Sequence, residues 1–141
     1  MVLSIIIVFL IILVVAVAGY EHYKINNQPD YNSDTTLLNY EIVGSGKNKL
    51  VMLHGLTGSL NYWKRELESI TKTHSLLLID LLGFGDSPKP KSDYSLSVQL
   101  QVLELILKKE GFNDGKTTIA GHSMGAIISL ALLEKYPHWF K

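Results

Sequence analysis

The sequence TIAGHSMGAIISL, residues 118–130, decides the fold of this chain. A G-x-S-x-G pentapeptide, Gly121 to Gly125, lies there between an apolar run typical of a buried strand and an apolar run typical of a buried helix. A strand that turns abruptly into a helix holds its central serine in a strained backbone conformation, and glycines on either side let the flanking segments approach. The pattern therefore predicts a sharp turn that exposes the Oγ atom of Ser123.

The predicted surroundings of Ser123 are those of a catalytic nucleophile. The amide of Met124 and the dipole of the helix that begins there would stabilise a negatively charged oxygen. His122 adjoins the serine, but adjacent side chains on a sharp turn diverge, so we expect it to support the site and not to act as the base. The alternative is a structural turn without chemistry, which the flanking strand and helix disfavour.

A second motif, H-G-x-x-G at residues 54–58, directly follows the apolar run of residues 50–53. A second donor to the oxyanion is expected at this place, and the backbone amide of Leu56 is the candidate. We expect His54 to hold the loop by hydrogen bonds rather than to move protons, with Gly55 as a further supporting residue.

A third glycine-rich stretch, DLLGFGDS at residues 80–87, follows the next apolar run. Gly83 and Gly85 alone are compatible with a dinucleotide-binding or phosphate-binding loop. No helix is expected directly after them and no G-K-[ST] sequence follows, so we predict a structural loop.

The elements around these motifs alternate between strand and helix. Gly111 and Pro137 mark the expected ends of two helices. The predicted strands are residues 37–43, 50–53, 76–80 and 117–120, and the predicted helices are residues 61–72, 95–110 and 124–136. This alternation predicts an α/β fold, a mostly parallel sheet flanked by helices.

The segments LVMLHGLTG, LLLIDLLGFGDS and TIAGHSMG occur in this order and together resemble the α/β-hydrolase family, in its branch of single-domain esterases, lipases and C–C-bond hydrolases. The resemblance covers residues 37–140. It implies a serine hydrolase in which Ser123 attacks the carbonyl of a small ester-like substrate and the amides of Leu56 and Met124 bind the oxyanion. A histidine would activate the serine, and no cofactor would be needed.

The family's catalytic triad continues with an acid and then a histidine, and Glu134 and His138 follow Ser123 in that order. On one continuous helix they would lie roughly 16 and 22 Å along the axis from the serine, whereas a general base needs contact at about 3 Å. His22 and His74 lie outside every motif. We therefore expect this chain to be the N-terminal half of a hydrolase, truncated after the helix that follows Ser123 and catalytically incomplete.

An exposed strand edge is the expected physical consequence of such a truncation. The strand of residues 117–120 would normally be central, and here its apolar edge would invite aggregation or pairing with a complementing C-terminal chain. We expect the isolated product to fold poorly and to hydrolyse esters negligibly.

The first twenty residues contain no charged side chain. Residues 2–19 would span roughly 27 Å as a helix, close to the thickness of a hydrocarbon core, so we predict a single transmembrane anchor. The alternatives are a buried helix and a cleaved secretory signal with an A-x-A pattern at residues 16–18, which would release a secreted domain. Acidic residues outnumber Lys24 after the run, which favours an extracytoplasmic domain.

The predicted organisation has three parts. Residues 1–20 are the anchor or signal, residues 21–36 are a polar linker, and residues 37–141 are the N-terminal part of an α/β-hydrolase domain.

Composition argues against several other functions. The 141 residues include 13 basic and 13 acidic side chains, and this balance argues against a nucleic-acid-binding protein. The absence of cysteine excludes disulfide scaffolds, thiolate zinc sites and cysteine nucleophiles. The five histidines are scattered without metal-binding spacing, so no metal site is predicted.

Three functions therefore compete. The first is a membrane-anchored serine hydrolase that acts on ester-like carbonyl substrates. The second is an acyltransferase or a non-ester hydrolase that uses the same residues, because one fold hosts several reactions. The third is a non-enzymatic half-domain that pairs with a partner chain, and its function would not depend on Ser123.

Overall fold

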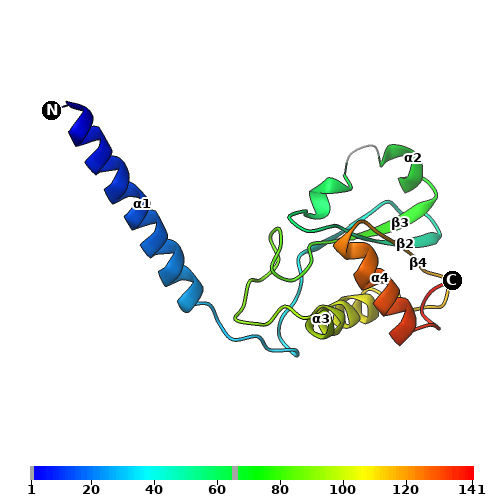
Figure 1. Cartoon of the computed structure of the whole chain (residues 1–141). Helices are drawn as coiled ribbons and strands as arrows, with labels where there is room; N and C mark the ends of the chain where they lie inside the picture. The colour runs from blue at the N-terminus through cyan, green and yellow to red at the C-terminus, as the bar shows by residue number, and fades with distance from the viewer. Residues whose placement is uncertain (1, 65–66) are drawn as a thin grey trace. The chain divides into compact units, whose positions relative to one another are not determined.

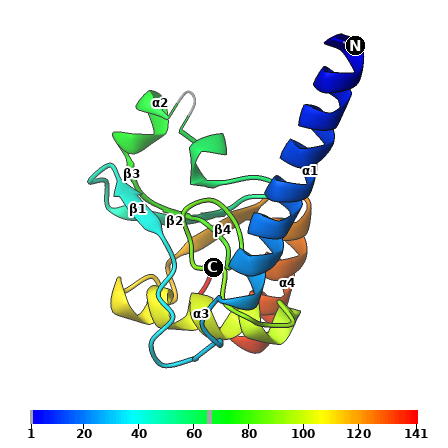
Figure 2. The same ribbon diagram turned by 90° about the vertical axis from the view of Figure 1, so that its left-hand side faces the viewer.

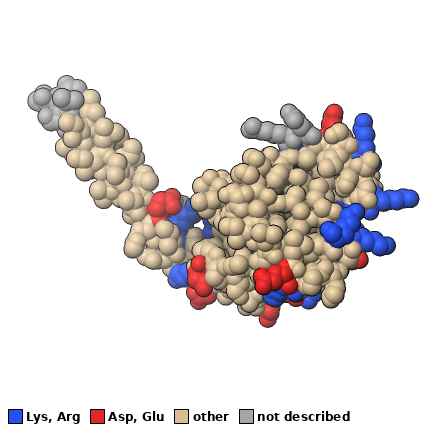
Figure 3. Space-filling view, turned by 45° about the vertical axis from the view of Figure 1, so that its right-hand side comes forward, with Lys and Arg blue, Asp and Glu red and all other residues tan. Residues whose placement is uncertain are grey.

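The computed structural model describes residues 2–64 and 67–141, which form two compact units divided after Asp30. The first unit contains helix α1 (Val2–Asn26). From Ile5 to Asn26 this helix is long and apolar enough to cross a membrane, with a mean hydropathy of 2.5. It shows no charged side chain along most of its length (Figure 3). The helix is therefore a candidate transmembrane segment.

Helix α1 is longer than the predicted anchor, because residues 21–26 of the predicted linker are helical. Glu21 and Lys24 have high helix propensity, and Lys24 in the last turn complements the helix dipole. The carbonyl oxygen of Tyr23 accepts from both the backbone amide of Asn27, at 3.1 Å, and the side-chain amide of the same residue, at 2.8 Å. The prediction of a linker was wrong for residues 21–26 because it rested on their polarity, and polar residues can also extend a helix.

The second unit, Tyr31–Lys141, is built on one four-stranded sheet with the order β1-β3-β2-β4. The strands are β1 (Tyr40–Val43), β2 (Asn48–Leu53), β3 (His74–Ile79) and β4 (Thr118–Gly121). Strand β1 is antiparallel to β3, and the other pairs are parallel. Leu53 lies opposite both Ile79 and Gly121, so β2, β3 and β4 end at the same edge of the sheet. The three glycine-rich motifs therefore begin side by side.

Successive side chains of each strand point to opposite faces of the sheet, and apolar side chains are buried on both faces. Helices α3 (Leu96–Lys109) and α4 (Met124–Lys135) lie on one face, and the 3-10 helix η1 (Leu60–Tyr62) and helix α2 (Glu68–Thr71) lie on the other (Figures 1 and 2). The side chains that face α3 and α4 are Val51, Leu53, Leu77 and Ile79, and those that face η1 and α2 are Leu50, Met52, Leu76 and Leu78.

Helices α3 and α4 begin and end close to the predicted positions. The hydroxyl of Ser95 caps α3 by accepting from the amide of Val98 at 3.4 Å, and Gly111 turns the chain after the helix with a φ of +71°. Helix α4 ends at Lys135, just before Pro137. The mostly parallel sheet with flanking helices confirms the predicted fold class.

The continuous helix predicted at residues 61–72 is wrong. The segment consists of η1, a turn and the short helix α2, with residues 65–66 outside the described residues. Its apolar side chains, Leu60, Trp63, Leu67 and Ile70, still pack on the sheet, so the periodicity located the buried face correctly. The amide of Leu60 donates to Asp80 at 2.6 Å, and this long-range bond fixes the start of the segment, where the side chain of the N-cap residue Ser59 makes no capping hydrogen bond.

All four strands differ from their predicted bounds: β1 starts at Tyr40 and not at residue 37, β2 starts at Asn48 and not at residue 50, β3 is His74–Ile79 and not residues 76–80, and β4 is Thr118–Gly121 and not residues 117–120. Strand β1 begins at Tyr40 rather than at residue 37, because the backbone and side chain of Asn39 are engaged by Ser87 and Asp80. Strand β4 is the last strand of the sheet order and, within the described residues, has one neighbouring strand, as predicted. At its start Thr117 pairs with Phe140 in an isolated bridge.

Candidate functional site

The turn between β4 and α4, residues 121–125, is called the Ser123 turn below. Ser123 has a φ of +53° and a ψ of −117°, a conformation that only glycine adopts without strain. Its carbonyl oxygen accepts from the amides of Ala126 at 2.9 Å and Ile127 at 3.3 Å. These bonds hold the strained backbone, and the Ser123 side chain lies exposed in front of the helix N-terminus.

Glycines 121 and 125 are required by close backbone contacts around this turn. A Cβ atom on Gly121 would lie less than 3.0 Å from the carbonyl oxygen of Gly125, and one on Gly125 would lie less than 3.0 Å from the carbonyl oxygens of Leu53 and His54. The amide of His122 donates to Leu53 at 3.0 Å. The G-x-S-x-G spacing therefore lets β4, α4 and the end of β2 meet.

The loop after β2, residues 54–58, lies beside Ser123. A Cβ atom on Gly55 would be 3.1 Å from the Cβ atom of Ser123 and 2.9 Å from Nδ1 of His122. Within residues 2–64 and 67–141, the backbone amides of Leu56 and Met124 donate to no protein group. The structure thus places one unpaired amide on the loop next to the serine and another on the residue that follows the serine.

Both ring nitrogens of His54 are engaged in this buried part of the site. Its Nε2 accepts from the amide of Leu81 at 3.0 Å, which requires the tautomer protonated on Nδ1, and Nδ1 then donates to the carbonyl oxygen of Gly55 at 2.8 Å. The ring also contacts Phe84 edge-on, with 5.7 Å between ring centroids. His54 ties the loop after β2 to the loop after β3 and has no free nitrogen for proton transfer.

The loop after β3, residues 80–87, is closed by its own hydrogen bonds. The buried carboxylate of Asp80 accepts from the amides of Leu60 and Asp86 and from the side chain of Asn39, at 2.6 to 2.9 Å. A Cβ atom on Gly85 would collide with this carboxylate. Gly85 therefore makes room for Asp80, an arrangement that the sequence pattern alone did not reveal.

The histidines and acids predicted as weak triad candidates do not contact Ser123. Glu134 is exposed in the last turn of α4, and His138 lies near Gly115, before the start of β4 and thus at the opposite end of that strand. His122 stacks on Tyr62 with 5.4 Å between ring centroids. In the described part of the chain, no histidine forms a hydrogen bond with the Ser123 hydroxyl.

A cavity of about 280 Å³ adjoins Met124 on the side of α3 and α4. Its lining residues are Phe84, Tyr94, Leu96, Gln99, Met124, Ile127 and Ile128. Tyr94 has a φ of +50°, and burial raises the pKa of its phenol, which stays neutral at physiological pH. In the described residues the non-glycine residues with positive φ are Thr57, Tyr94 and Ser123, and backbone strain of this kind concentrates at functional sites.

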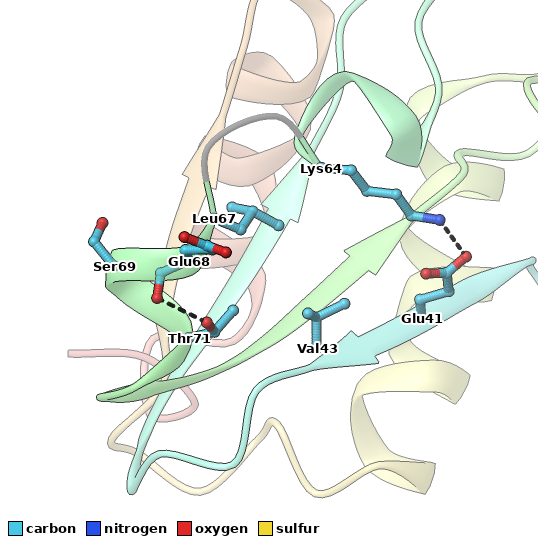
Figure 4. Close-up of a pocket in the computed structure, with 7 residues that line it drawn as sticks. All are labelled: Glu41, Val43, Lys64, Leu67, Glu68, Ser69 and Thr71. Atoms are coloured by element: carbon cyan, nitrogen blue, oxygen red, sulfur yellow. Dashed lines mark hydrogen bonds and ion pairs between the residues drawn. The ribbon is translucent and has the colours of Figure 1, made fainter.

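A broader hollow of about 780 Å³ lies on the other side of the sheet, between β1 and the segment around α2 (Figure 4). An ion pair between Lys64 and Glu41, at 2.6 Å, joins two of its lining residues. Its described lining contains neither histidine nor tyrosine, and it does not include the Ser123 turn. Volume alone is therefore a poor guide here, and we assign the candidate site to the Ser123 turn.

The described residues contain no group of three or more histidine, cysteine, aspartate or glutamate side chains arranged to hold a metal ion. The sequence reasoning missed the cavity because Phe84, Tyr94 and α3 lie far from Ser123 along the chain. The only local indication of the cavity was the N-cap residue Ser95, which places Tyr94 directly before the start of α3.

The fold and the order of the three loops define the class of protein. Residues 48–141 match the family model for the alpha/beta hydrolase fold, which is more than half of the chain. The chain therefore belongs to the α/β-hydrolase family, and the predicted family is confirmed.

Individual relatives include enzymes named for lipid chemistry. The chain is 37% identical over 111 residues to the probable lysophospholipase BODYGUARD 4 of Arabidopsis thaliana, covering 77% of this chain and 26% of that protein. It is 34% identical over 95 residues to a 1-acylglycerol-3-phosphate O-acyltransferase of Rattus norvegicus, covering 66% and 27%. The chain thus spans about a quarter of the length of these relatives.

Among solved structures, the chain is similar to MGS-M2, an alpha/beta hydrolase enzyme from a deep-sea metagenome library. The two share 32% sequence identity with a TM-score of 0.68, and the match covers 74% of this chain and 38% of MGS-M2.

Proposed function

We propose that this chain supplies the nucleophile and the oxyanion hole of a membrane-anchored serine hydrolase that acts on ester-like substrates. The observation that carries the proposal is the backbone of Ser123, strained at a φ of +53° and held directly before helix α4. Strain in a residue that leaves its own hydroxyl exposed stabilises nothing in the fold, and it is the geometry expected of a nucleophile elbow.

The proposed reaction begins with attack of Ser123 Oγ on the substrate carbonyl carbon. The carbonyl oxygen becomes negatively charged and accepts hydrogen bonds from the amides of Leu56 and Met124, which the described residues leave unpaired. The hydroxyl proton passes to a histidine, which returns it to the departing alcohol, and water then hydrolyses the acyl-enzyme. We propose that this histidine and its acid come from polypeptide other than residues 1–141, either continuous with them or in a complementing chain.

Acyl transfer is the second candidate, because the acyl-enzyme can be attacked by an alcohol instead of water. The relative named as an acyltransferase makes this outcome specific enough to test. The two reactions share Ser123, Leu56 and Met124 and differ only in the acceptor.

The proposed location of the enzyme rests on helix α1. We propose that α1 is an uncleaved single-pass anchor and that the hydrolase domain faces away from the cytoplasm; secretion after cleavage is the alternative outcome. The cysteine-free chain allows a direct test. Ser45→Cys, in an exposed turn, should react with a membrane-impermeant maleimide in intact cells, and α1 should remain attached to the labelled product.

Serine labelling tests the chemistry. A fluorophosphonate probe applied to membranes that contain the native protein should label wild type and the control Ser97→Ala, which removes an exposed hydroxyl of α3. Ser123→Ala should lose the label completely. Equal labelling of the two variants would contradict the proposal, and transfer of the acyl group to added glycerol in place of hydrolysis would favour acyl transfer.

A further inference from the structure

The two proposed oxyanion donors belong to segments that lie far apart along the chain. The amide of Leu56 lies in the loop after β2, and the amide of Met124 begins helix α4. One oxygen atom can accept from both amides only if each lies about 2.7–3.1 Å from it. Some contact must therefore fix the distance between the loop after β2 and the Ser123 turn before the substrate binds.

The direction of the Leu56 amide is set by the carbonyl group of the preceding residue. The carbonyl oxygen of Gly55 accepts from Nδ1 of His54 at 2.8 Å and from the amide of Gly58 at 3.0 Å. Because the trans peptide group is planar, the N–H of Leu56 points away from that oxygen and from both of its donors. These bonds orient the donor but do not connect it to the Ser123 turn.

His122 makes that connection from the Ser123 turn. Its backbone amide donates to the carbonyl oxygen of Leu53 at 3.0 Å. Its ring lies over the loop after β2, since a Cβ atom on Gly55 would be 2.9 Å from Nδ1 of His122. The same ring stacks on Tyr62, with 5.4 Å between the ring centroids and 24° between the ring planes. One side chain therefore contacts the chain on both sides of Leu56, at Gly55 and at η1.

The stack is not explained by burial in the core. Tyr62 is 53% exposed, and His122 is also exposed. The neighbours of Tyr62 along the chain, Leu60 and Trp63, pack on the sheet and hold η1 there. The ring of Trp63 contacts that of Tyr62 edge-on, with 4.9 Å between centroids, so the core supports the stack from one side. An exposed pair of stacked rings adds little apolar burial, and its effect is to hold two segments at a fixed spacing.

We infer that His122 and Tyr62 are positioning residues that set the separation of the two oxyanion donors, and this inference rests on the proposed function. The flat faces of the two rings perform this role, and no proton moves through His122. Loss of either ring leaves the hydrogen bond to Leu53 intact but frees the loop around Leu56 to move. A displacement of about 0.5 Å is enough to weaken the hydrogen bonds of a catalytic site.

A pair of probes tests the inference on membranes that contain the native protein. Both are alkyl fluorophosphonates, and in the second a sulfur atom replaces the phosphoryl oxygen. In each reaction Ser123 Oγ bonds to phosphorus, fluoride leaves, and the serine proton passes to the histidine of the proposed mechanism. Sulfur accepts hydrogen bonds more weakly than oxygen, so the ratio of the two labelling rates measures the contribution of the oxyanion donors. This ratio does not depend on the fraction of the protein that is folded.

Removal of either ring should change this ratio. His122→Ala and Tyr62→Ala should each lower the oxygen-to-sulfur ratio roughly tenfold, and the double variant should lower it no further, because both substitutions remove the same stack. His122→Phe and Tyr62→Phe, which keep a stacking ring, should stay within about twofold of wild type. The matched control is His74→Ala, at the start of β3 and thus at the opposite end of the sheet, which should leave the ratio unchanged.

Two results would overturn the inference: a wild-type ratio in His122→Ala and Tyr62→Ala, or a ratio in His122→Phe as low as that in His122→Ala. Because Tyr62 is exposed, Tyr62→Ala should keep the fold, and its ratio decides between the outcomes if His122→Ala gives no labelling. Persistent labelling of Ser123→Ala would contradict the proposed function, whereas loss of that label together with unchanged ratios contradicts the positioning role alone.

Discussion

The loop after β3 and the Ser123 turn after β4 begin at the same edge of the sheet, and both are rich in glycine, yet they use glycine differently. In the loop after β3, Gly85 makes room for the buried carboxylate of Asp80. In the Ser123 turn, Gly121 and Gly125 let three backbone segments meet so that one serine is held outward.

The polar groups of the two segments show the contrast most clearly. Asp80 accepts three hydrogen bonds, and Ser87 donates to the carbonyl oxygen of Asp80 while accepting from the amide of Asn39. In the described part of the chain, the hydroxyl of Ser123 and the amide of Met124 have no protein partner. The loop after β3, whose polar groups are hydrogen-bonded, contributes to stability. A strained backbone beside polar groups that lack a protein partner is instead typical of a site that binds a ligand.

Gly125→Ala should have the largest effect on the Ser123 turn. The added methyl group would lie less than 3.0 Å from the carbonyl oxygens of Leu53, the last residue of β2, and His54, and backbone atoms cannot move aside. We expect a loss of about 3–5 kcal/mol, measured by urea unfolding of the full chain in detergent micelles with emission from Trp63 and Trp139. Gly111→Ala is the control, because its methyl would make only an ordinary contact with Nζ of Lys49, at 3.8 Å, and only backbone strain would remain; equal losses would contradict the close-contact argument.

Asp80→Asn tests whether the loop after β3 is structural. The substitution removes a charged acceptor and leaves at least one of its buried donors unpaired, which should cost about 2–3 kcal/mol in the same unfolding measurement. Asp86→Asn, whose carboxylate is exposed, should change stability by less than about 0.5 kcal/mol. Equal losses of unfolding free energy in Asp80→Asn and Asp86→Asn would contradict the structural role of Asp80.

Ser123→Gly should measure the strain stored in the Ser123 turn. Glycine adopts the observed φ of +53° freely, whereas Ser123→Ala keeps the strain and removes only the hydroxyl. After allowance for the greater flexibility of unfolded glycine, we expect the glycine variant to be more stable than the alanine variant by about 1 kcal/mol. Identical midpoints in urea would mean that this turn stores no strain.

Asp114 at the opposite end of the sheet should give the smallest effect. Hydrogen bonding and attraction from Lys49, at 2.9 Å, lower the pKa of its carboxyl from 3.8 to about 2. A lowered pKa means that the stabilisation is complete above about pH 4 and is lost as the pH falls toward 2. Because both side chains are partly exposed, Asp114→Asn should cost only about 0.5–1 kcal/mol at pH 7.

Unfolding followed at several pH values checks this prediction. The difference between Asp114→Asn and wild type should shrink below about pH 4 and disappear only below pH 2, where the native carboxyl becomes fully protonated. A difference that is constant from pH 7 to pH 2 would show that the ion pair is not its origin.

Much of the fold was predictable because its signals are local. The strands, helices α3 and α4, the apolar helix and the strand–turn–helix at Ser123 each follow from spacing within a few residues. The segment after residue 60 was not predictable in the same way. Leu60, Trp63 and Leu67 have helical spacing, but the segment is broken where Leu60 bonds to Asp80, a residue of another loop.

The sequence by itself determined the family, the two glycines around Ser123 and the position of the apolar helix, since each depends on the order and size of neighbouring residues. Only the tertiary structure decided that both nitrogens of His54 are engaged, that Asp80 accepts three hydrogen bonds, and that Phe84, Tyr94 and Ile127 line one cavity. These features need contacts between residues distant along the chain, and such contacts form only when parallel strands bring their carboxyl ends to one edge of a sheet.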